Sequence, residues 1–316
     1  MSQSWTVDRT ITTPLLLEGP VLDKRWGDRS LLGEFGLPER GGDKAGEIWL
    51  VSDMPGRPSR VLNLPGEPGL DVVMAEAGES ILGAGHGDQP FPLIVKLLMA
   101  GRRLSVQVHP DGASARRLGV ADRGKREAWW VVGARDGSCI WRGLERDCTV
   151  AEARGAITAG TFQELMTRHD PRAGDVYDIV PGTFHGVGDG VLLFEVQERC
   201  DVTFRVYDWG NPNTELHIEQ ALDVGRLEGG DGTGAATPAP FRMEPVVVEP
   251  DGAVPVGGSA GPEILVVLSG NVELRSGGSV LKAGPGATAL WPATLEAGVL
   301  ASEGGARLMR SVPEIR

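Results

Sequence analysis

The chain has 316 residues, 41% of them hydrophobic, and is long enough to bury a substantial core in one large or two medium domains. Its formal net charge of −12 argues against a nucleic-acid or membrane partner, because either would need a basic surface. There is no apolar run of about 18 residues, no export signal and only three scattered cysteines, so we expect a cytoplasmic protein in a reducing compartment with a small-molecule or protein partner.

Short runs of β-branched and apolar residues dominate the first part of the chain, and glycine and proline separate them. These runs lie at 47–53, 59–64, 71–77, 93–100, 104–109 and 127–134. Strands of this length between turn residues are typical of an all-β sandwich or barrel. The sequence therefore predicts a mainly β protein.

Two segments depart from this pattern and predict helices beside the β core. Residues 149–170 begin with Thr149 and carry Glu152 three residues later, which is the pattern of a capping box. Residues 213–227 form the second helical segment. Strands resume around and between them at 174–180, 191–197 and 202–209.

A segment rich in Gly, Ala, Thr and Pro, residues 228–240, predicts a linker or exposed loop and a domain boundary near residue 240. After it, residues 262–293 alternate apolar strands with glycine turns, as in the closing half of a cupin-type barrel. That stretch has no His and no Cys, so we expect no metal centre there.

The segment "LSVQVHPD" at 104–111 places Gln107 and His109 two positions apart between valines. Side chains at i and i+2 of a strand leave on the same face, so the two polar groups point one way and Val106 and Val108 the other. Taken alone, such a histidine is more often a hydrogen-bonded core residue than a ligand.

Two further candidate ligands, Glu127 in "EAWWVV" and His185 in "PGTFHG", come from separate strand-like segments. Inward-facing residues of neighbouring strands converge in a closed barrel. Two imidazoles, a carboxylate and an amide oxygen suit Zn²⁺, with Fe²⁺, Mn²⁺ or Co²⁺ as alternatives. The alternatives without a metal are that Glu127 begins a strand at the rim and that Gln107 hydrogen-bonds to the backbone.

Four blocks of the sequence, residues 91–111, 124–132, 181–210 and 215–224, together resemble the type I mannose-6-phosphate isomerase family in its short bacterial form. Their order and spacing match from roughly residue 20 to residue 225. The resemblance implies one zinc ion per chain, held by Gln107, His109, Glu127 and His185.

The resemblance also implies two cupin-type (double-stranded β-helix or jelly-roll) barrels with a small helical element. We expect a zinc-binding catalytic domain at 1–240, with inserted helices at about 149–170 and 213–227, and a second, metal-free cupin-like β domain at 241–316.

Three basic residues extend the candidate site, because an acidic protein needs a local positive pocket to bind a sugar phosphate. Lys96 interrupts an apolar strand, and Lys125 precedes Glu127 by two residues. Arg205 stands where the family has an active-site arginine, with a salt bridge to Asp208 or Glu198 as the alternative. Ser105 shares the Gln107 face and is a further substrate-binding candidate.

The function implied is a zinc-dependent aldose–ketose isomerase that interconverts mannose 6-phosphate and fructose 6-phosphate through a cis-enediol. Lys125 or Lys96, with a lowered pKa, is the expected base, and Arg205 stabilises developing charge or holds the phosphate. The alternatives are an isomerase of the same fold for another, non-phosphorylated sugar, or a non-catalytic sugar-binding cupin. We expect a monomer or homodimer.

Overall fold

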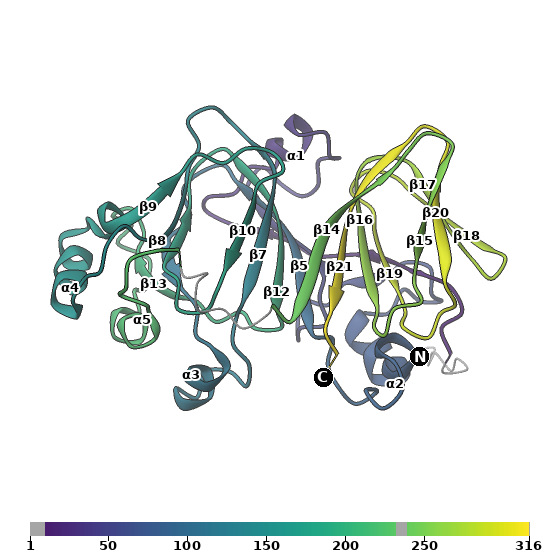
Figure 1. Ribbon diagram of the computed structural model, residues 1–316, viewed down its shortest axis with the longest axis horizontal. Coiled ribbons are helices and arrows are strands. Elements are labelled where there is room, and N and C mark those ends of the chain that lie inside the picture. The colour runs from purple at the N-terminus through teal and green to yellow at the C-terminus, as the bar shows by residue number, and fades with distance from the viewer. Residues whose placement is uncertain (1–9, 232–238, 316) are drawn as a thin grey trace.

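A computed structural model describes residues 10–231 and 239–315 of the chain. Within this part the protein is mainly β, with four antiparallel sheets arranged in two pairs that stand side by side (Figure 1). We number these sheets 1 to 4. No helix in the described residues has the length and apolar character needed to span a membrane.

Sheets 1 and 2 form the N-terminal sheet pair. In spatial order, sheet 1 contains β10 (Val176–Ile179), β7 (Glu127–Ala134), β12 (Val191–Glu198), β5 (Leu93–Ala100), β3 (Ala45–Val51) and β2 (Val21–Asp23). Sheet 2 contains β13 (Phe204–Tyr207), β6 (Val106–Val108), β11 (His185–Val187), β8 (Ile140–Leu144) and β9 (Met166–His169). The strands predicted at 93–100 and 127–134 are confirmed as β5 and β7.

Sheets 3 and 4 form the C-terminal sheet pair. Sheet 3 contains β14 (Phe241–Val248), β21 (Ala306–Pro313), β16 (Glu263–Gly270), β19 (Thr288–Trp291), β1 (Leu15–Glu18) and β4 (Arg60–Val61). Sheet 4 contains β15 (Gly252–Val256), β20 (Gly298–Ser302), β17 (Val272–Ser276) and β18 (Ser279–Ala283). The early strands β1 and β4 thus complete a sheet built mostly from residues after 240, because β1 pairs with β19. Most of the predicted linker, residues 232–238, lies outside the described residues.

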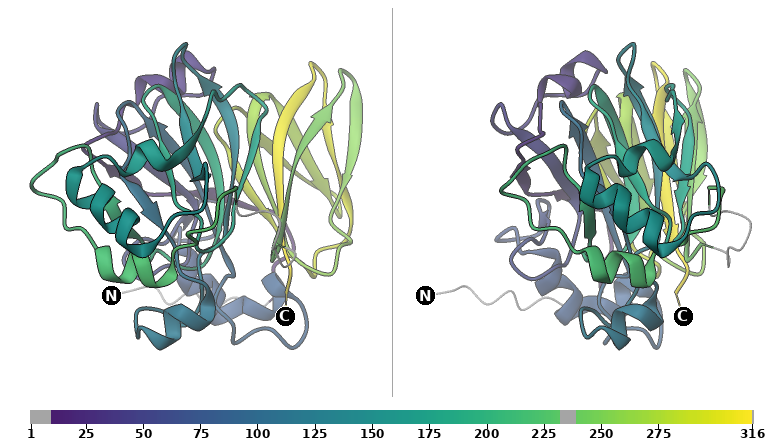
Figure 2. Two further views of the ribbon diagram at one scale, coloured as in Figure 1. Left: turned by 60° about the vertical axis from the view of Figure 1, so that its left-hand side comes forward. Right: turned by 90° about the vertical axis from the view of Figure 1, so that its left-hand side faces the viewer.

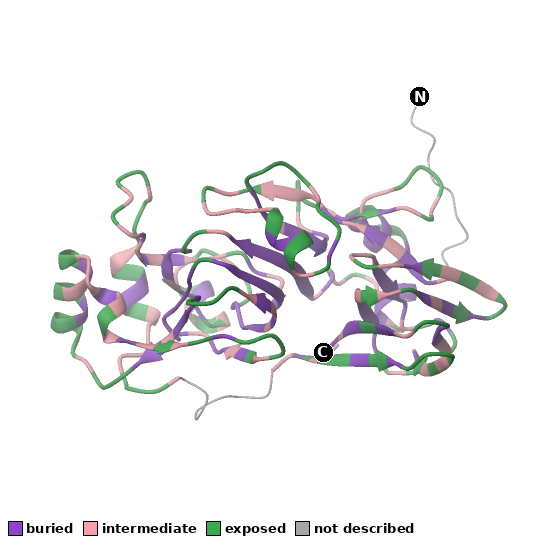
Figure 3. Cartoon of the chain, turned by 90° about the horizontal axis from the view of Figure 1, so that it is seen from above, coloured by how far each residue is buried: buried purple, intermediate pink, exposed green. Residues whose placement is uncertain are grey.

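Sheets 1 and 3 pack against each other through their outer faces, so the two pairs share one apolar core. Val95, Leu97 and Met99 of β5 point into this core, together with Ile264 and Val266 of β16. The alternate residues of the same strands point into the separate interior of each pair, as the two-residue period of a strand requires. Figure 2 shows the two pairs side by side, and Figure 3 shows buried residues concentrated along the strands and exposed ones along the loops.

Short helices cover the sheets. They are α1 (Ser30–Glu34), α2 (Leu70–Leu82), α3 (Gly112–Arg117), α4 (Val150–Ala159), the 3-10 helix η1 (Phe162–Leu165) and α5 (Ile218–Val224). The capping box predicted at Thr149 and Glu152 is present at the start of α4. This helix is shorter than the predicted range because Gly160 adopts a left-handed conformation (φ 71°), and Met166–His169 then pairs with β8 as β9.

The strand predicted at 71–77 is wrong, since this stretch lies within α2. Two consecutive valines favour a strand by local propensity, but the buried side chains Leu70, Val73, Met74, Ala77 and Ile81 recur at helical spacing. The helix places this apolar stripe against the core shared by sheets 1 and 3. α2 is kinked at Ala77, whose backbone angles are not helical (φ −134°, ψ 27°), and the helical periodicity on both sides of the kink outweighs the β propensity of a short valine pair.

Candidate active site

The polar face predicted for residues 104–111 lies inside the N-terminal sheet pair. Val106 and Val108 pack on the opposite face of sheet 2, in the core that this sheet shares with α4 and α5. Gln107, between them, lies opposite His185 of β11 in the sheet register. The alternation seen in the sequence therefore sends Gln107 toward sheet 1, as predicted.

Two loops hold the candidate ligands in place through backbone hydrogen bonds. The Lys125 amide donates to the Pro110 carbonyl (3.0 Å), directly after His109, and the Gly182 amide donates to the His109 carbonyl (2.9 Å). Gly124 allows the first approach, since a Cβ there would lie 2.6 Å from the Gly112 nitrogen. Gly182 has φ 88°, a conformation that glycine adopts without strain.

Three of the predicted metal ligands meet at one buried point. The nearest donor atoms of His109, Glu127 and His185 all lie within 4.8 Å of one another. His109 Nε2 is 3.5 Å from Glu127 Oε2, and His185 Nε2 is 3.5 Å from Glu127 Oε1. All three side chains are at most 1% exposed, so water competes little for these donor atoms.

Both histidines present an unprotonated nitrogen to this point. Nδ1 of His109 donates to the Val202 carbonyl and Nδ1 of His185 to the Thr183 carbonyl, each at 2.9 Å. A carbonyl only accepts, so Nδ1 carries the proton and Nε2 keeps its lone pair. Burial lowers the pKa of His109 to about 3 and also lowers the pKa of His185, so both rings are neutral at neutral pH.

Glu127 supplies the negative charge of the cluster. Burial alone would raise the pKa of its carboxyl, but the positive charge of Lys125 keeps that pKa well below its usual range. Lys125 Nζ lies 2.7 Å from Glu127 Oε2 and 3.1 Å from His109 Nε2. Neither Glu127 oxygen accepts a well-aligned hydrogen bond from any residue in the described part of the chain. Ionised, buried and short of donors, this carboxylate is suited to a cation.

Gln107 lies at the edge of the same cluster. Its Nε2 is 3.3 Å from His185 Nε2, and its Oε1 accepts a hydrogen bond from Ser105 Oγ at 3.3 Å. A half-turn of the amide about its last bond would exchange the two atoms and present the oxygen to the cluster. Ser105 is 9% exposed and lies on the predicted face.

The spacing of these donors fits a single small cation. Ligand atoms about 2.0–2.1 Å from a tetrahedral Zn²⁺ are separated by about 3.3–3.4 Å. His109 Nε2 and His185 Nε2 are each 3.5 Å from a different oxygen of Glu127, and one ligand atom from each of the three residues lies within 4.8 Å of the others, somewhat wider than that value. The Gln107 atom 3.3 Å from His185 Nε2 is its Nε2. Two neutral imidazoles, one carboxylate and one amide form a donor set that Zn²⁺ accepts.

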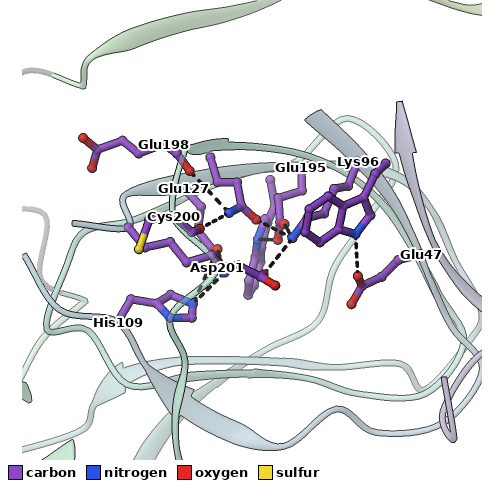
Figure 4. Close-up of polar contacts among 12 residues, drawn as sticks. Glu47, Lys96, His109, Glu127, Glu195, Glu198, Cys200 and Asp201 are labelled. Carbon is purple, nitrogen blue, oxygen red and sulfur yellow. Dashed lines mark hydrogen bonds and ion pairs between the residues drawn. The ribbon is translucent and has the colours of Figure 1, made fainter. Parts of the chain in front are cut away.

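Lys96 faces the interior of the N-terminal sheet pair rather than extending to its rim. Its Nζ lies 3.3 Å from Glu195 Oε1 and 3.7 Å from Asp201 Oδ1, and it donates to Gln197 Oε1 (Figure 4). The same ammonium lies over the ring of Trp49, 4.7 Å from its centroid. Lys96 is therefore held by a group of carboxylates beside the His–Glu–His cluster.

The carboxylates around Lys96 oppose the expected lowering of its pKa. Burial does favour a lower pKa, but Glu195 and then Glu47 and Asp201 raise it above its usual value. Lys96 is thus a fixed positive charge at neutral pH.

Arg205 of β13 lies opposite Gln107 in sheet 2, and its side chain is half-buried. It makes no ion pair with any described residue, so the alternative salt bridges to Asp208 and Glu198 are not formed. Asp208 instead pairs with Arg25, at 2.8 Å. The guanidinium therefore remains available to an anionic ligand.

Glu195 is a buried carboxylate near the cluster that was not predicted from the sequence. Its Oε2 accepts a hydrogen bond from Trp129 Nε1 at 2.9 Å, and the Trp129 and His185 rings form a T-shaped pair with centroids 5.5 Å apart. Burial and the nearby Glu127 charge raise the pKa of Glu195. The sequence feature that could have identified Glu195 is its position as an ionisable residue inside the apolar run "VLLFEVQ", on the same strand face as Leu193.

Known proteins resemble this chain in sequence. A model of the phosphomannose isomerase type I catalytic domain matches residues 15–127. The mannose-6-phosphate isomerase of Streptococcus mutans is 38% identical over 220 residues, covering 67% of each chain. A probable mannose-6-phosphate isomerase of Bacillus subtilis, GmuF, is 36% identical over 222 residues, covering 68% of this chain and 69% of that protein.

Solved structures extend the similarity over almost the whole chain. The crystal structure of the Bacillus subtilis mannose 6-phosphate isomerase has a TM-score of 0.82 and 25% identity, covering 95% of this chain and 99% of that one. A putative mannosephosphate isomerase from Archaeoglobus fulgidus, 21% identical with a TM-score of 0.81 over 96% of this chain and 99% of that one, shares the fold. The chain belongs to the type I phosphomannose isomerase family.

Proposed function

We propose that the protein is a zinc-dependent aldose–ketose isomerase that interconverts mannose 6-phosphate and fructose 6-phosphate. The observation that carries this proposal is the buried cluster of His109, Glu127 and His185, with Lys125 in contact, in a member of this family. The names of the relatives support the same activity.

Gln107, His109, Glu127 and His185 would hold one zinc ion per chain, with Fe²⁺, Mn²⁺ or Co²⁺ as alternatives. When bound, this ion supplies Lewis acidity toward O1 and O2 of the sugar, or an anchor that orders the substrate. The Val202 and Thr183 carbonyls orient the two imidazoles through their Nδ1 protons.

The isomerisation moves a proton between C2 and C1 through a cis-enediol, while a second proton passes between O1 and O2. A base must take the carbon-bound proton and return it to the neighbouring carbon. We assign this role to Lys125, because its Nζ contacts the ligand set, 2.7 Å from Glu127, and a cation bound there would replace the positive charge that Lys125 supplies to that carboxylate. Lys96 remains charged among its carboxylates and is better suited to binding substrate oxygens and stabilising negative charge.

Arg205 and Ser105 complete the proposed substrate site. Arg205 lies in register with Gln107 and forms no ion pair within residues 10–231 and 239–315, which suits it to negative charge on the enediolate oxygens or the phosphate. Ser105 Oγ, bonded to Gln107, offers a hydroxyl on the same face.

We also propose that each sheet pair is a cupin-type barrel, with a catalytic domain at 1–240 and a second domain at 241–316. The facing sheets of each pair and the apolar interior of the second pair support this division, with β1 and β4 as the part of the first domain that completes sheet 3. We propose a monomer or homodimer in the cytoplasm, and the three free cysteines are in keeping with a reducing compartment.

Turnover of mannose 6-phosphate before and after chelation tests the proposal. We expect activity in the purified protein, its loss with the metal, and its return with added Zn²⁺. Turnover of unphosphorylated mannose at equal or greater efficiency would indicate a different sugar substrate. Binding of sugar without turnover, in protein loaded with stoichiometric metal, would indicate a non-catalytic sugar-binding protein.

A further inference from the structure

Two rows of side chains face each other inside the N-terminal sheet pair. The row on sheet 2, one residue per strand in register, is Arg205, Gln107, His185 and Arg142. The row on sheet 1 is Lys96, Glu195, Trp129 and Tyr177. Residues directly opposite each other in adjacent antiparallel strands share a face, so each row lines the interior.

Contacts between the rows fix how they are aligned. Trp129 meets His185 edge to face, with ring centroids 5.5 Å apart. The Arg142 guanidinium lies 5.5 Å from the centroid of the Tyr177 ring. Arg142 therefore reaches between the two sheets, one strand beyond His185, at the end of the row opposite to Arg205.

The Arg142 side chain is 12% exposed and keeps unused donor capacity. Its Nη2 donates to Asp231 Oδ2 at 2.7 Å, and its Nη1 makes a long contact of 3.4 Å with the Asp178 carbonyl. Its Nε is buried and has no hydrogen-bond partner within residues 10–231 and 239–315. A buried donor without an acceptor is costly, and a planar guanidinium binds phosphate oxygens through paired hydrogen bonds.

The two ends of the rows differ in how their cations are engaged. At one end, Lys96 is already paired with the carboxylates of Glu195 and Asp201, and Arg205 lies opposite the proposed ligand Gln107. At the other end, the sheet 1 row contributes the neutral ring of Tyr177, and the carboxylate paired with Arg142 is the partly exposed Asp231. The anionic end of a substrate is therefore favoured at Arg142.

We propose that Arg142 binds the phosphate of the sugar phosphate, exchanging its contact with Asp231 for the phosphate oxygens. This inference rests on the proposed isomerase function, which places C1 and C2 at the metal ligands. The phosphate is at the other end of the carbon chain, and Arg142 lies on the strand next to that of His185, about 4.8 Å away. Arg205 is then left to stabilise charge on O1 and O2.

Steady-state kinetics of Arg142→Met, with bound zinc measured alongside, test this proposal. We expect the KM for mannose 6-phosphate to rise at least tenfold while kcat changes by less than about threefold, and zinc content to stay at the wild-type value. The inhibition constant of inorganic phosphate should rise by a similar factor. Arg142→Lys, which keeps the charge but loses the paired donors, should fall between Met and wild type.

Arg168→Met is the matched control, because Arg168 lies on the adjacent strand β9 opposite Trp141, on the other face of sheet 2. It should leave the KM and phosphate inhibition unchanged. Should Arg142→Met fail to fold, Asp231→Asn provides a second measurement: it frees Arg142 and should strengthen inhibition by inorganic phosphate.

An unchanged KM and phosphate inhibition constant in folded Arg142→Met would overturn the proposal while leaving the isomerase function intact. So would weaker or unaltered phosphate inhibition in Asp231→Asn. Absence of turnover in the metal-loaded wild type would instead count against the proposed function, so the two failures are distinguishable.

Discussion

The two sheet pairs share an architecture of facing antiparallel sheets but fill their interiors differently. Between sheets 3 and 4 the buried side chains are mostly aliphatic or aromatic, including Leu265, Leu274, Leu300 and Leu308, with Glu263, Ser276 and Ser302 as buried polar residues. Between sheets 1 and 2 the corresponding space holds ionisable and amide side chains, among them Glu127 and Lys96, which are buried as deeply as the leucines.

The two interiors therefore contribute differently to the stability of the fold and to the chemistry of the site. Burying apolar side chains stabilises a domain by about 25 cal/mol per Å² of surface removed from water. Burying charges costs free energy unless they are paired, and even then gives little net stability. The N-terminal pair therefore gives up part of its packing energy to hold a reactive site. The C-terminal pair, whose sheet 3 packs on the back of sheet 1, provides apolar stabilisation.

The largest expected effect is that of Glu127→Gln, which removes the charge of the proposed metal site. We expect bound zinc to fall from one equivalent to below about a tenth, and turnover to fall by at least roughly 10⁴-fold, because an uncharged amide is a poor substitute for a carboxylate ligand. Elemental analysis and coupled turnover measure both. Glu263→Gln, at a buried carboxylate of the C-terminal pair, is the control and should keep full metal. Stoichiometric zinc in Glu127→Gln would refute the site.

Lys125→Met should separate proton transfer from metal binding. We expect kcat to fall by about 10²–10⁴-fold, the usual contribution of a general base, while zinc content stays near one equivalent. The reason is that Lys125 contacts the ligands without being one, at 2.7 Å from Glu127. Activity near wild type with full metal would remove Lys125 from the mechanism.

Leu308→Ala tests whether the interior of the C-terminal pair contributes to stability and not to the site. Leu308 is 1% exposed in the interior of the C-terminal pair, so truncation should lower the free energy of unfolding by about 2–5 kcal/mol. Denaturant unfolding measures the loss. Below the unfolding transition, KM and zinc content should match wild type. A tenfold change in KM in the folded variant would show that the two interiors are coupled.

A further expected effect is on the pH dependence of stability in metal-free protein. Because burial lowers the pKa of His109 to about 3, the unfolded chain binds a proton below about pH 6.5 that the folded chain does not. Stability from this residue is complete above pH 6.5 and is lost as pH falls toward 3, by about 1.4 kcal/mol per pH unit. Urea unfolding measures the free energy of unfolding at each pH. Between pH 6 and 4, this free energy should fall less steeply with pH in chelated His109→Gln than in the chelated wild type, by about this amount. An unchanged slope would contradict a buried neutral His109.

Much of the fold followed from local patterns in the sequence. The apolar runs at 93–100 and 127–134 became strands with the predicted bounds, and the capping box at Thr149 began a helix. The prediction failed at 71–77, where a valine pair suggested a strand and helical periodicity prevailed. The helix predicted to reach residue 170 ends at Ala159, because pairing with β8 draws the following segment into sheet 2.

The sequence by itself determined which residue types the site would contain. The alternation in "LSVQVH" placed Gln107 and His109 on one face, and the family motifs added Glu127 and His185. Only the tertiary structure decided the charge state of Lys96 and the places of Glu195 and Arg142. Their neighbours come from strands distant in the chain, and a pKa or an unpaired donor depends on which charges and acceptors lie within a few ångströms. Spacing along a strand determines which face a side chain takes, whereas strand order and register determine what it meets there.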